Sequence, residues 1–166
     1  MIPLTHKALK TSALAILVAA TAPIAAQAET LSPVDTVVVP LFDAVAKEDL
    51  AAASAYLVDG APIHAMFNPN GSTDAASVRT FPAVAYFTLV TRNYENIVFR
   101  ERTYSVSDDG KTVWMEANGD LRLEKTGTPY RNRYVFKFSL NKDGKVTEIR
   151  EWVNTVTLTR QGITAN

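Results

Sequence analysis

The sequence contains no cysteine among its 166 residues and only two histidines. Without thiols the chain forms no disulfide, has no thiolate zinc ligands and offers no cysteine nucleophile. His6 lies in the predicted leader described next, so His64 is the one histidine expected in the mature chain, and a multi-histidine metal site is excluded as well. We therefore expect neither a metal nor a cofactor, and a fold stabilised by packing alone.

The sequence also lacks an uninterrupted apolar stretch long enough to span a membrane. Two lysines precede the apolar run Ala13–Ala20, and the small-residue motif Ala26–Ala28 follows it, which is the order of a secretory signal peptide. A permanent anchor needs about 20 consecutive apolar residues, and Thr21 and Pro23 interrupt this run. The pattern predicts a signal peptide over residues 1–28, export to the periplasm or the medium, and no membrane association after processing.

An excess of positive charge is absent too. The sequence has 17 Lys and Arg against 17 Asp and Glu, and removal of the two leader lysines leaves a formal net charge of −2. Nucleic-acid binding requires a basic surface, so no nucleic-acid partner is expected. Arg131, Arg133 and Lys137 alternate along one extended run, which predicts the solvated face of a strand.

The sequence of the mature chain predicts helices in its first part and mainly strands in its second part. Ser32-Pro33 and Asp49 have the composition of helix starts, and Asp143-Gly144 is one of several glycine-containing turn signals. Helices are expected over residues 34–45, 50–57 and 80–93, and strands over 62–68, 97–107, 112–124, 130–140 and 145–158. This order predicts one α+β domain over residues 29–166, in which helices cover one face of a curved antiparallel sheet.

The last two strands carry the clearest sign of a binding site. Tyr130, Asn132, Tyr134, Phe136 and Phe138 alternate with polar or smaller residues, so this set is expected to face the interior. An apolar core excludes an amide unless the amide is hydrogen-bonded. The pattern favours a cavity for a small apolar molecule, and a hydrogen-bonded polar core is the alternative. The predicted recognition wall consists of Asn132, Tyr134, Trp152 and Asn154.

The same hairpin resembles the SnoaL-like branch of the nuclear transport factor 2-like superfamily. The resemblance rests on the element order and on Phe136, Phe138, Asp143-Gly144-Lys145, Ile149 and Arg150-Glu151-Trp152. It implies a cone-shaped fold with an open apolar cavity, in a family of isomerases, cyclases, dehydratases, epoxide hydrolases and proteins without a known reaction. Related enzymes often have an aspartate at the position of Asn154, and an amide carries no proton at neutral pH.

Any acid–base step must then use another residue. Glu116 shares a face with Trp114 and Asn118, and a carboxyl group in an aromatic wall becomes a plausible general base. The alternative is an exposed carboxylate paired with Arg100 or Arg102. Histidine is the residue type best suited to proton transfer at neutral pH, which makes His64 a second candidate, although a lone strand histidine is more often a structural residue.

Three functions remain open on the sequence. The first is an exported enzyme that uses Glu116 or His64 in acid–base catalysis, as an isomerase, lyase or hydrolase acting on a small apolar substrate. The second is a non-catalytic ligand-binding module. The third is an interaction protein whose sheet face pairs in a homodimer.

Overall fold

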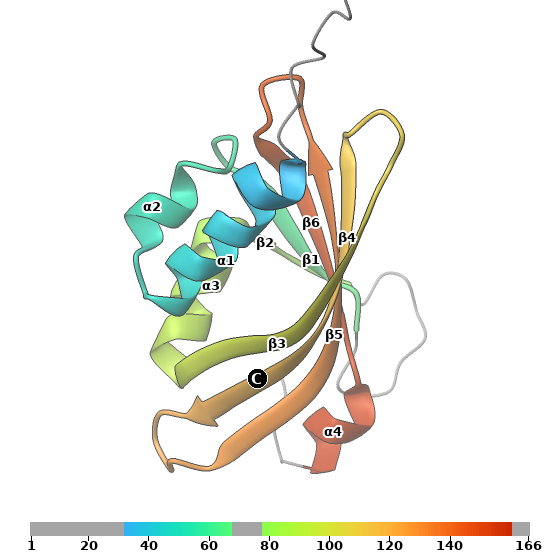
Figure 1. The fold of residues 1–166 in the computed structure, drawn as a ribbon. Coiled ribbons are helices and arrows are strands. Elements are labelled where there is room, and N and C mark those ends of the chain that lie inside the picture. The colour runs from blue at the N-terminus through green and yellow to red at the C-terminus, as the bar shows by residue number, and fades with distance from the viewer. Residues whose placement is uncertain (1–31, 68–77, 161–166) are drawn as a thin grey trace, which may run out of the picture.

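The computed structural model describes residues 32–67 and 78–160, which form a helical layer packed on one face of a strongly bent sheet (Figure 1). The predicted signal peptide lies outside the described residues. The helical elements are η1 (Val34–Val38), α1 (Val39–Ala46), α2 (Leu50–Ser54), α3 (Ala83–Asn93) and α4 (Thr155–Arg160). None of the described helices has the length and apolar character needed to cross a membrane.

The first helix begins where the sequence predicts, and it contains a π-helical turn ahead of Pro40. The Val39 N–H bonds back to the Val34 carbonyl, five residues earlier. Proline has no N–H to continue the regular hydrogen-bond ladder, and the wide π-helical turn lies directly before it. At α2 the expected cap is confirmed, since the Asp49 Oδ1 accepts a 2.9 Å hydrogen bond from the Ala52 N–H.

The sheet has six strands, in the order β2-β1-β6-β5-β4-β3. All neighbouring pairs are antiparallel except β1 and β6. The strands are β1 (Pro62–Ala65), β2 (Arg79–Pro82), β3 (Tyr94–Val106), β4 (Thr112–Leu123), β5 (Pro129–Leu140) and β6 (Val146–Val153). The predicted α+β fold is confirmed, and Gly144, with a positive φ of 75°, forms the β5–β6 turn.

Several element boundaries differ from the prediction. Helix α2 ends at Ser54, strand β1 ends at Ala65 and strand β3 begins at Tyr94. Two other differences change the element to which a segment belongs. Residues 79–82 form β2 beside β1, so the third helix begins at Ala83 and not at Thr80. Pro82 is extended and ends that strand, and no side chain caps the helix. The last strand ends at Val153, and residues up to Leu158 belong to α4.

Curvature of the sheet creates the space for a site. In β3, Asn96 and Glu101 both have a φ of 52°, and pairing with β4 shifts at both places. Such bulges bend a strand and increase its twist. The lower halves of β3, β4 and β5 therefore sweep beneath α1 and α3 (Figure 1).

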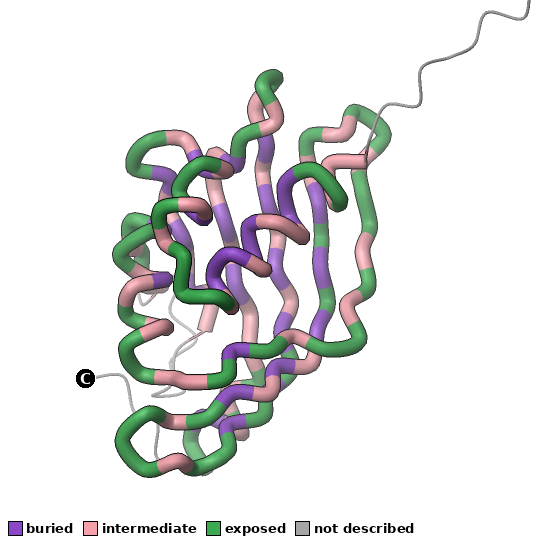
Figure 2. The backbone as a smooth tube through the Cα atoms, turned by 60° about the vertical axis from the view of Figure 1, so that its left-hand side comes forward, coloured by how far each residue is buried: buried purple, intermediate pink, exposed green. Residues whose placement is uncertain are grey.

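Buried and exposed positions alternate along the long strands (Figure 2). In β5 the predicted inward face is confirmed: Tyr130, Asn132, Tyr134, Phe136 and Phe138 are buried. Arg131 and Arg133 are exposed and Lys137 is half-buried, all on the other face. The inward side chains pack against the apolar faces of α1 and α3.

Candidate functional site

An aromatic cavity lies between the helices and the inner face of the bent sheet. Its volume is about 140 Å³. An apolar cavity of about 150 Å³ is large enough for benzene, so the space fits a molecule with a single ring. The lining consists of Phe42, Val45, Phe67, Tyr86, Phe87, Val90, Tyr94, Phe99, Leu121, Tyr130, Tyr134, Phe136, Glu151, Val153 and Leu158.

Glu151 is the one carboxylate in this lining. It lies on β6 opposite Phe136 of β5, beside Ala65 of β1, and only 4 % of its surface is exposed. The Tyr86 hydroxyl of α3 donates a hydrogen bond to its Oε2. Burial raises the pKa of Glu151 from 4.5 to about 7, and the hydrogen bond from Tyr86 opposes that rise. Such a group exchanges a proton readily at neutral pH.

Tyrosine hydroxyls occupy much of the remaining polar surface in the cavity. Burial raises the pKa of Tyr86 and Tyr134 well above the ordinary value of 10, and it raises the pKa of Tyr94 to about 12. The pKa of Tyr130 is raised by burial as well. All four hydroxyls are therefore protonated at neutral pH, and the single Tyr86 proton is already donated to Glu151.

Two of the four predicted recognition residues belong to this region. Tyr134 lines the cavity, and Asn132 is buried beside it with its Nδ2 donating to the Tyr130 hydroxyl at 2.8 Å. The hydrogen-bonded polar core and the ligand cavity, which the sequence leaves as alternatives, therefore both occur here. Asn132 belongs to the polar core and Tyr134 to the cavity.

The predicted inward position of Trp152 is wrong. Tyr134 pairs with Val153 and Val135 pairs with Trp152, so the indole points to the outer face of the sheet. There it stacks on Trp114, with ring centroids 5.7 Å apart, and the Lys137 ammonium lies 5.7 Å from the centre of the Trp114 ring.

Asn154 does not line the cavity either. It is exposed, and its Oδ1 accepts a 3.0 Å hydrogen bond from the Val156 N–H, which makes it the N-cap of α4. Aspartate caps a helix as well as asparagine does. The start of this helix therefore accounts for a capping side chain at position 154, and it does not distinguish an amide from an acid there.

The two predicted acid–base residues both lie outside the aromatic cavity. Glu116 is exposed on the outer face of β4, in a shallow groove with Glu101 and Arg133. The His64 Nδ1 is 2.9 Å from the Thr80 Oγ1 of β2, on the face opposite the buried Ile63. Sequence reasoning missed Glu151, the acid that does line the cavity. Counting outward along both strands from the Asp143-Gly144 turn pairs Glu151 with the inward-facing Phe136 and would have placed it on the inner face.

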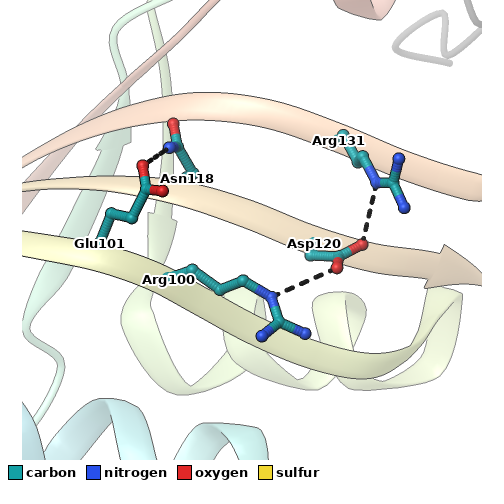
Figure 3. A network of polar contacts seen from close by, with 5 residues as sticks. All are labelled: Arg100, Glu101, Asn118, Asp120 and Arg131. Carbon is teal, nitrogen blue, oxygen red and sulfur yellow. Dashed lines mark hydrogen bonds and ion pairs between the residues drawn. The ribbon is translucent and has the colours of Figure 1, made fainter.

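The outer face carries a polar network instead (Figure 3). Asp120 accepts from the Arg100 Nε at 3.4 Å and from the Arg131 Nε at 3.3 Å, while the Asn118 amide donates to Glu101. Both arginine side chains are more than 60 % exposed, and exposed ion pairs contribute little stability. Residues 32–67 and 78–160 contain no group of three His, Asp or Glu side chains arranged to hold a metal ion.

Comparison with known proteins agrees with this geometry. The sequence model of the SnoaL-like domain matches residues 38–149, well over half of the chain, and the protein belongs to that family. It has the α+β fold of the nuclear transport factor 2-like superfamily, with N-terminal helices and a six-stranded, mostly antiparallel sheet. No curated protein matches the chain.

Solved structures share this fold at low sequence identity. A provisionally assigned isomerase from Bacillus subtilis has a TM-score of 0.64 and 18% sequence identity. The match covers 80% of this chain and 94% of the isomerase. An NTF2-like protein from Burkholderia xenovorans has a TM-score of 0.57 and 21% sequence identity. The match covers 77% of this chain and 94% of that protein. A third structure is SalBIII, an epoxide hydrolase/cyclase-like enzyme with a role in pyran ring formation in the polyether salinomycin. It has a TM-score of 0.57 and 20% sequence identity, and the match covers 74% of this chain and 92% of SalBIII.

Proposed function

We propose that this protein binds a small, mainly apolar molecule with one ring and that Glu151 moves a proton on it. The observation that supports this most directly is a buried carboxyl group in an aromatic cavity, with a pKa raised to about 7. Enzymes place general acids and bases in such surroundings because a pKa near the working pH gives the greatest benefit. The proposal agrees with the fold that this chain shares with a provisionally assigned isomerase and a cyclase-like enzyme.

Within this proposal each cavity group has a role. Glu151 in its ionised form abstracts a proton from the ligand, and in its protonated form returns it at another atom, as isomerases and lyases require. Tyr86 holds one carboxylate oxygen in place through its hydroxyl. The phenyl rings around the cavity exclude water and hold the apolar body of the ligand.

A panel of single-ring compounds tests the catalytic role. Wild-type protein is expected to turn over at least one cyclic enone, epoxide or lactone, and Glu151→Gln is expected to reduce the rate by about a hundredfold or more, the usual contribution of a positioned acid or base. Glu116→Gln removes a carboxylate outside the cavity and serves as the matched control. Equal rates for wild type and Glu151→Gln would contradict the role of Glu151.

A non-catalytic ligand-binding module is the second candidate. Its support is that Tyr86 already satisfies one oxygen of Glu151 inside the protein, so the carboxyl group has a structural partner. Compounds that raise the melting temperature without being converted would select this candidate, because a ligand of the folded state stabilises it by mass action.

Export is part of the proposal, on the signal-like order of residues 1–28. The mature protein is expected to begin at Glu29. Intact-mass measurement of the secreted or periplasmic fraction checks this, and a full-length protein retained in the cytoplasm would contradict it.

A further inference from the structure

Glu151 has one carboxylate oxygen bound inside the protein and one that is open. Its Oε2 accepts from the Tyr86 hydroxyl, whereas its Oε1 has no hydrogen-bond partner among residues 32–67 and 78–160. In that part of the chain no fully enclosed side-chain oxygen or nitrogen lacks a partner, so Oε1 is not enclosed by protein atoms. Because Glu151 lines the aromatic cavity, this open oxygen is an acceptor available to a ligand.

The protein supplies no positive charge to this carboxylate. None of the described residues that line the cavity is lysine, arginine or histidine, and Glu151 takes part in none of the ion pairs of the described chain. The titratable groups that interact with it electrostatically are all phenols: Tyr86 from α3, Tyr94 from β3, and Tyr130 and Tyr134 from β5. Burial of an unpaired carboxylate is costly, and a positively charged ligand would offset that cost.

Aromatic rings form most of the remaining cavity wall. Nine of the fifteen lining residues are phenylalanine or tyrosine. The faces of such rings attract cations, and cages of aromatic side chains bind organic ammonium ions in this way. One open carboxylate oxygen within an aromatic wall provides both a counter-ion and an apolar surface, which together suit an amine with an apolar body.

Gly119 leaves room for such a ligand on the sheet side of the cavity. It lies on β4 opposite Asn132, and a Cβ atom at this position would be 2.4 Å from the Tyr134 Cε2, far below van der Waals contact. The Tyr134 ring therefore lies over the glycine, and it stacks on Phe136 with the centroids 5.6 Å apart. A side chain at position 119 would displace this ring from the sheet toward the cavity, which has about the volume that benzene requires.

From these contacts we infer that the ligand is a monocyclic amine bound in its protonated form, with an ammonium N–H donating to the Glu151 Oε1 and the ring among the aromatic side chains. The inference rests on the proposed function, because it names the class of ligand for the same cavity. An ammonium group also brings a transferable proton to the carboxylate that moves protons in that proposal. A six-membered ring that contains the nitrogen has the size that the cavity accommodates.

Binding of piperidine and cyclohexane to the full chain tests the inference. The two rings have the same size, and only piperidine carries an ammonium group at neutral pH. In Glu151→Gln the affinity for piperidine at pH 8 is expected to fall by about tenfold or more, the usual range for a hydrogen bond to a charged group, while cyclohexane shows no such loss. Glu116→Gln removes the same charge from the outer face and should bind piperidine as wild type does. Equal piperidine affinities in wild type and Glu151→Gln, or no binding of piperidine to wild type, would overturn the inference.

The pH dependence of binding to wild type gives a second measurement that needs no variant. Glu151 pairs with the ammonium only when it is ionised, and its pKa in the folded protein is about 7, whereas an alkylammonium group such as that of lysine keeps its proton up to about pH 10. Piperidine affinity is therefore expected to rise by about tenfold per pH unit well below pH 7 and to level off above it. The four tyrosines keep their protons throughout this range. An affinity that stays constant or falls as the pH rises would contradict pairing with the carboxylate and overturn the inference.

These results are separable from those for catalysis. Loss of turnover in Glu151→Gln with equal piperidine affinity in the two proteins would support the proposed function and overturn this inference. Piperidine binding that depends on Glu151, in a wild type that converts no ring compound, would do the reverse.

Discussion

Between pH 4.5 and pH 7 the wild-type protein is expected to lose about 3 kcal/mol of unfolding free energy because of Glu151 alone. The pKa of this group is about 7 in the folded protein against 4.5 as its ordinary value. The folded state then binds more protons than the unfolded state across this interval, so stability falls as the pH rises. The loss is absent below pH 4.5 and complete above pH 7.

Urea unfolding at a series of pH values measures this effect. Glu151→Gln keeps an oxygen that accepts from Tyr86 but has no charge. The unfolding free energy of this variant should therefore exceed that of wild type above pH 7, and it should not decrease between pH 4.5 and pH 7 because of residue 151. Glu116→Gln, altered on the outer face, should retain the wild-type fall. Parallel pH profiles for wild type and Glu151→Gln would show that burial does not hold the carboxyl group neutral.

Phe42→Ala is expected to lower the unfolding free energy by about 3–5 kcal/mol, the usual cost of removing a buried phenyl ring. The Phe42 ring makes edge contacts with Phe99, Phe136 and Phe138, with centroids 5.0, 5.0 and 5.7 Å apart. It is the ring through which α1 contacts the bent sheet, and its removal leaves an enlarged cavity that the rigid wall cannot fill.

Denaturant midpoints compared at constant m-value measure the loss. Val84→Ala on α3, where the valine is 41 % exposed, should change stability by no more than about 0.5 kcal/mol. A loss below 1 kcal/mol in Phe42→Ala would mean that the helical layer closes over the vacated space.

Local signals in the sequence account for most of the fold. Ser32-Pro33, Asp49 and the Asp143-Gly144 turn place their elements correctly, because capping and turn formation depend on neighbouring residues. Residues 79–82 could not be placed in this way. They pair with β1, whose partner residues are 14 to 20 positions earlier in the sequence, and Thr80 taken alone has the composition of a helix cap.

The inward face was predicted correctly on β5 and incorrectly on β6. Alternation along β5 correctly gave Asn132 and Tyr134. On β6 the shared parity of Trp152 and Asn154 was assigned to the inward face, and the acid between Arg150 and Trp152 was overlooked. Tyr86, the partner of Glu151, is 65 residues away in the sequence. A buried acid becomes recognisable as a site only when both its surroundings and its partner are known.

The bonds of Asn132 have an evolutionary consequence. Its amide orients Tyr130 and also holds the backbone of Asn154, the residue that starts α4, while Leu158 of α4 lines the cavity. One side chain thus holds both a hydroxyl of the cavity wall and the start of the helix that carries Leu158 to the cavity. Relatives that replace Asn132 must change both contacts at once, so positions 130, 132, 154 and 158 are expected to co-vary in this lineage, and Gly119 to change together with position 134.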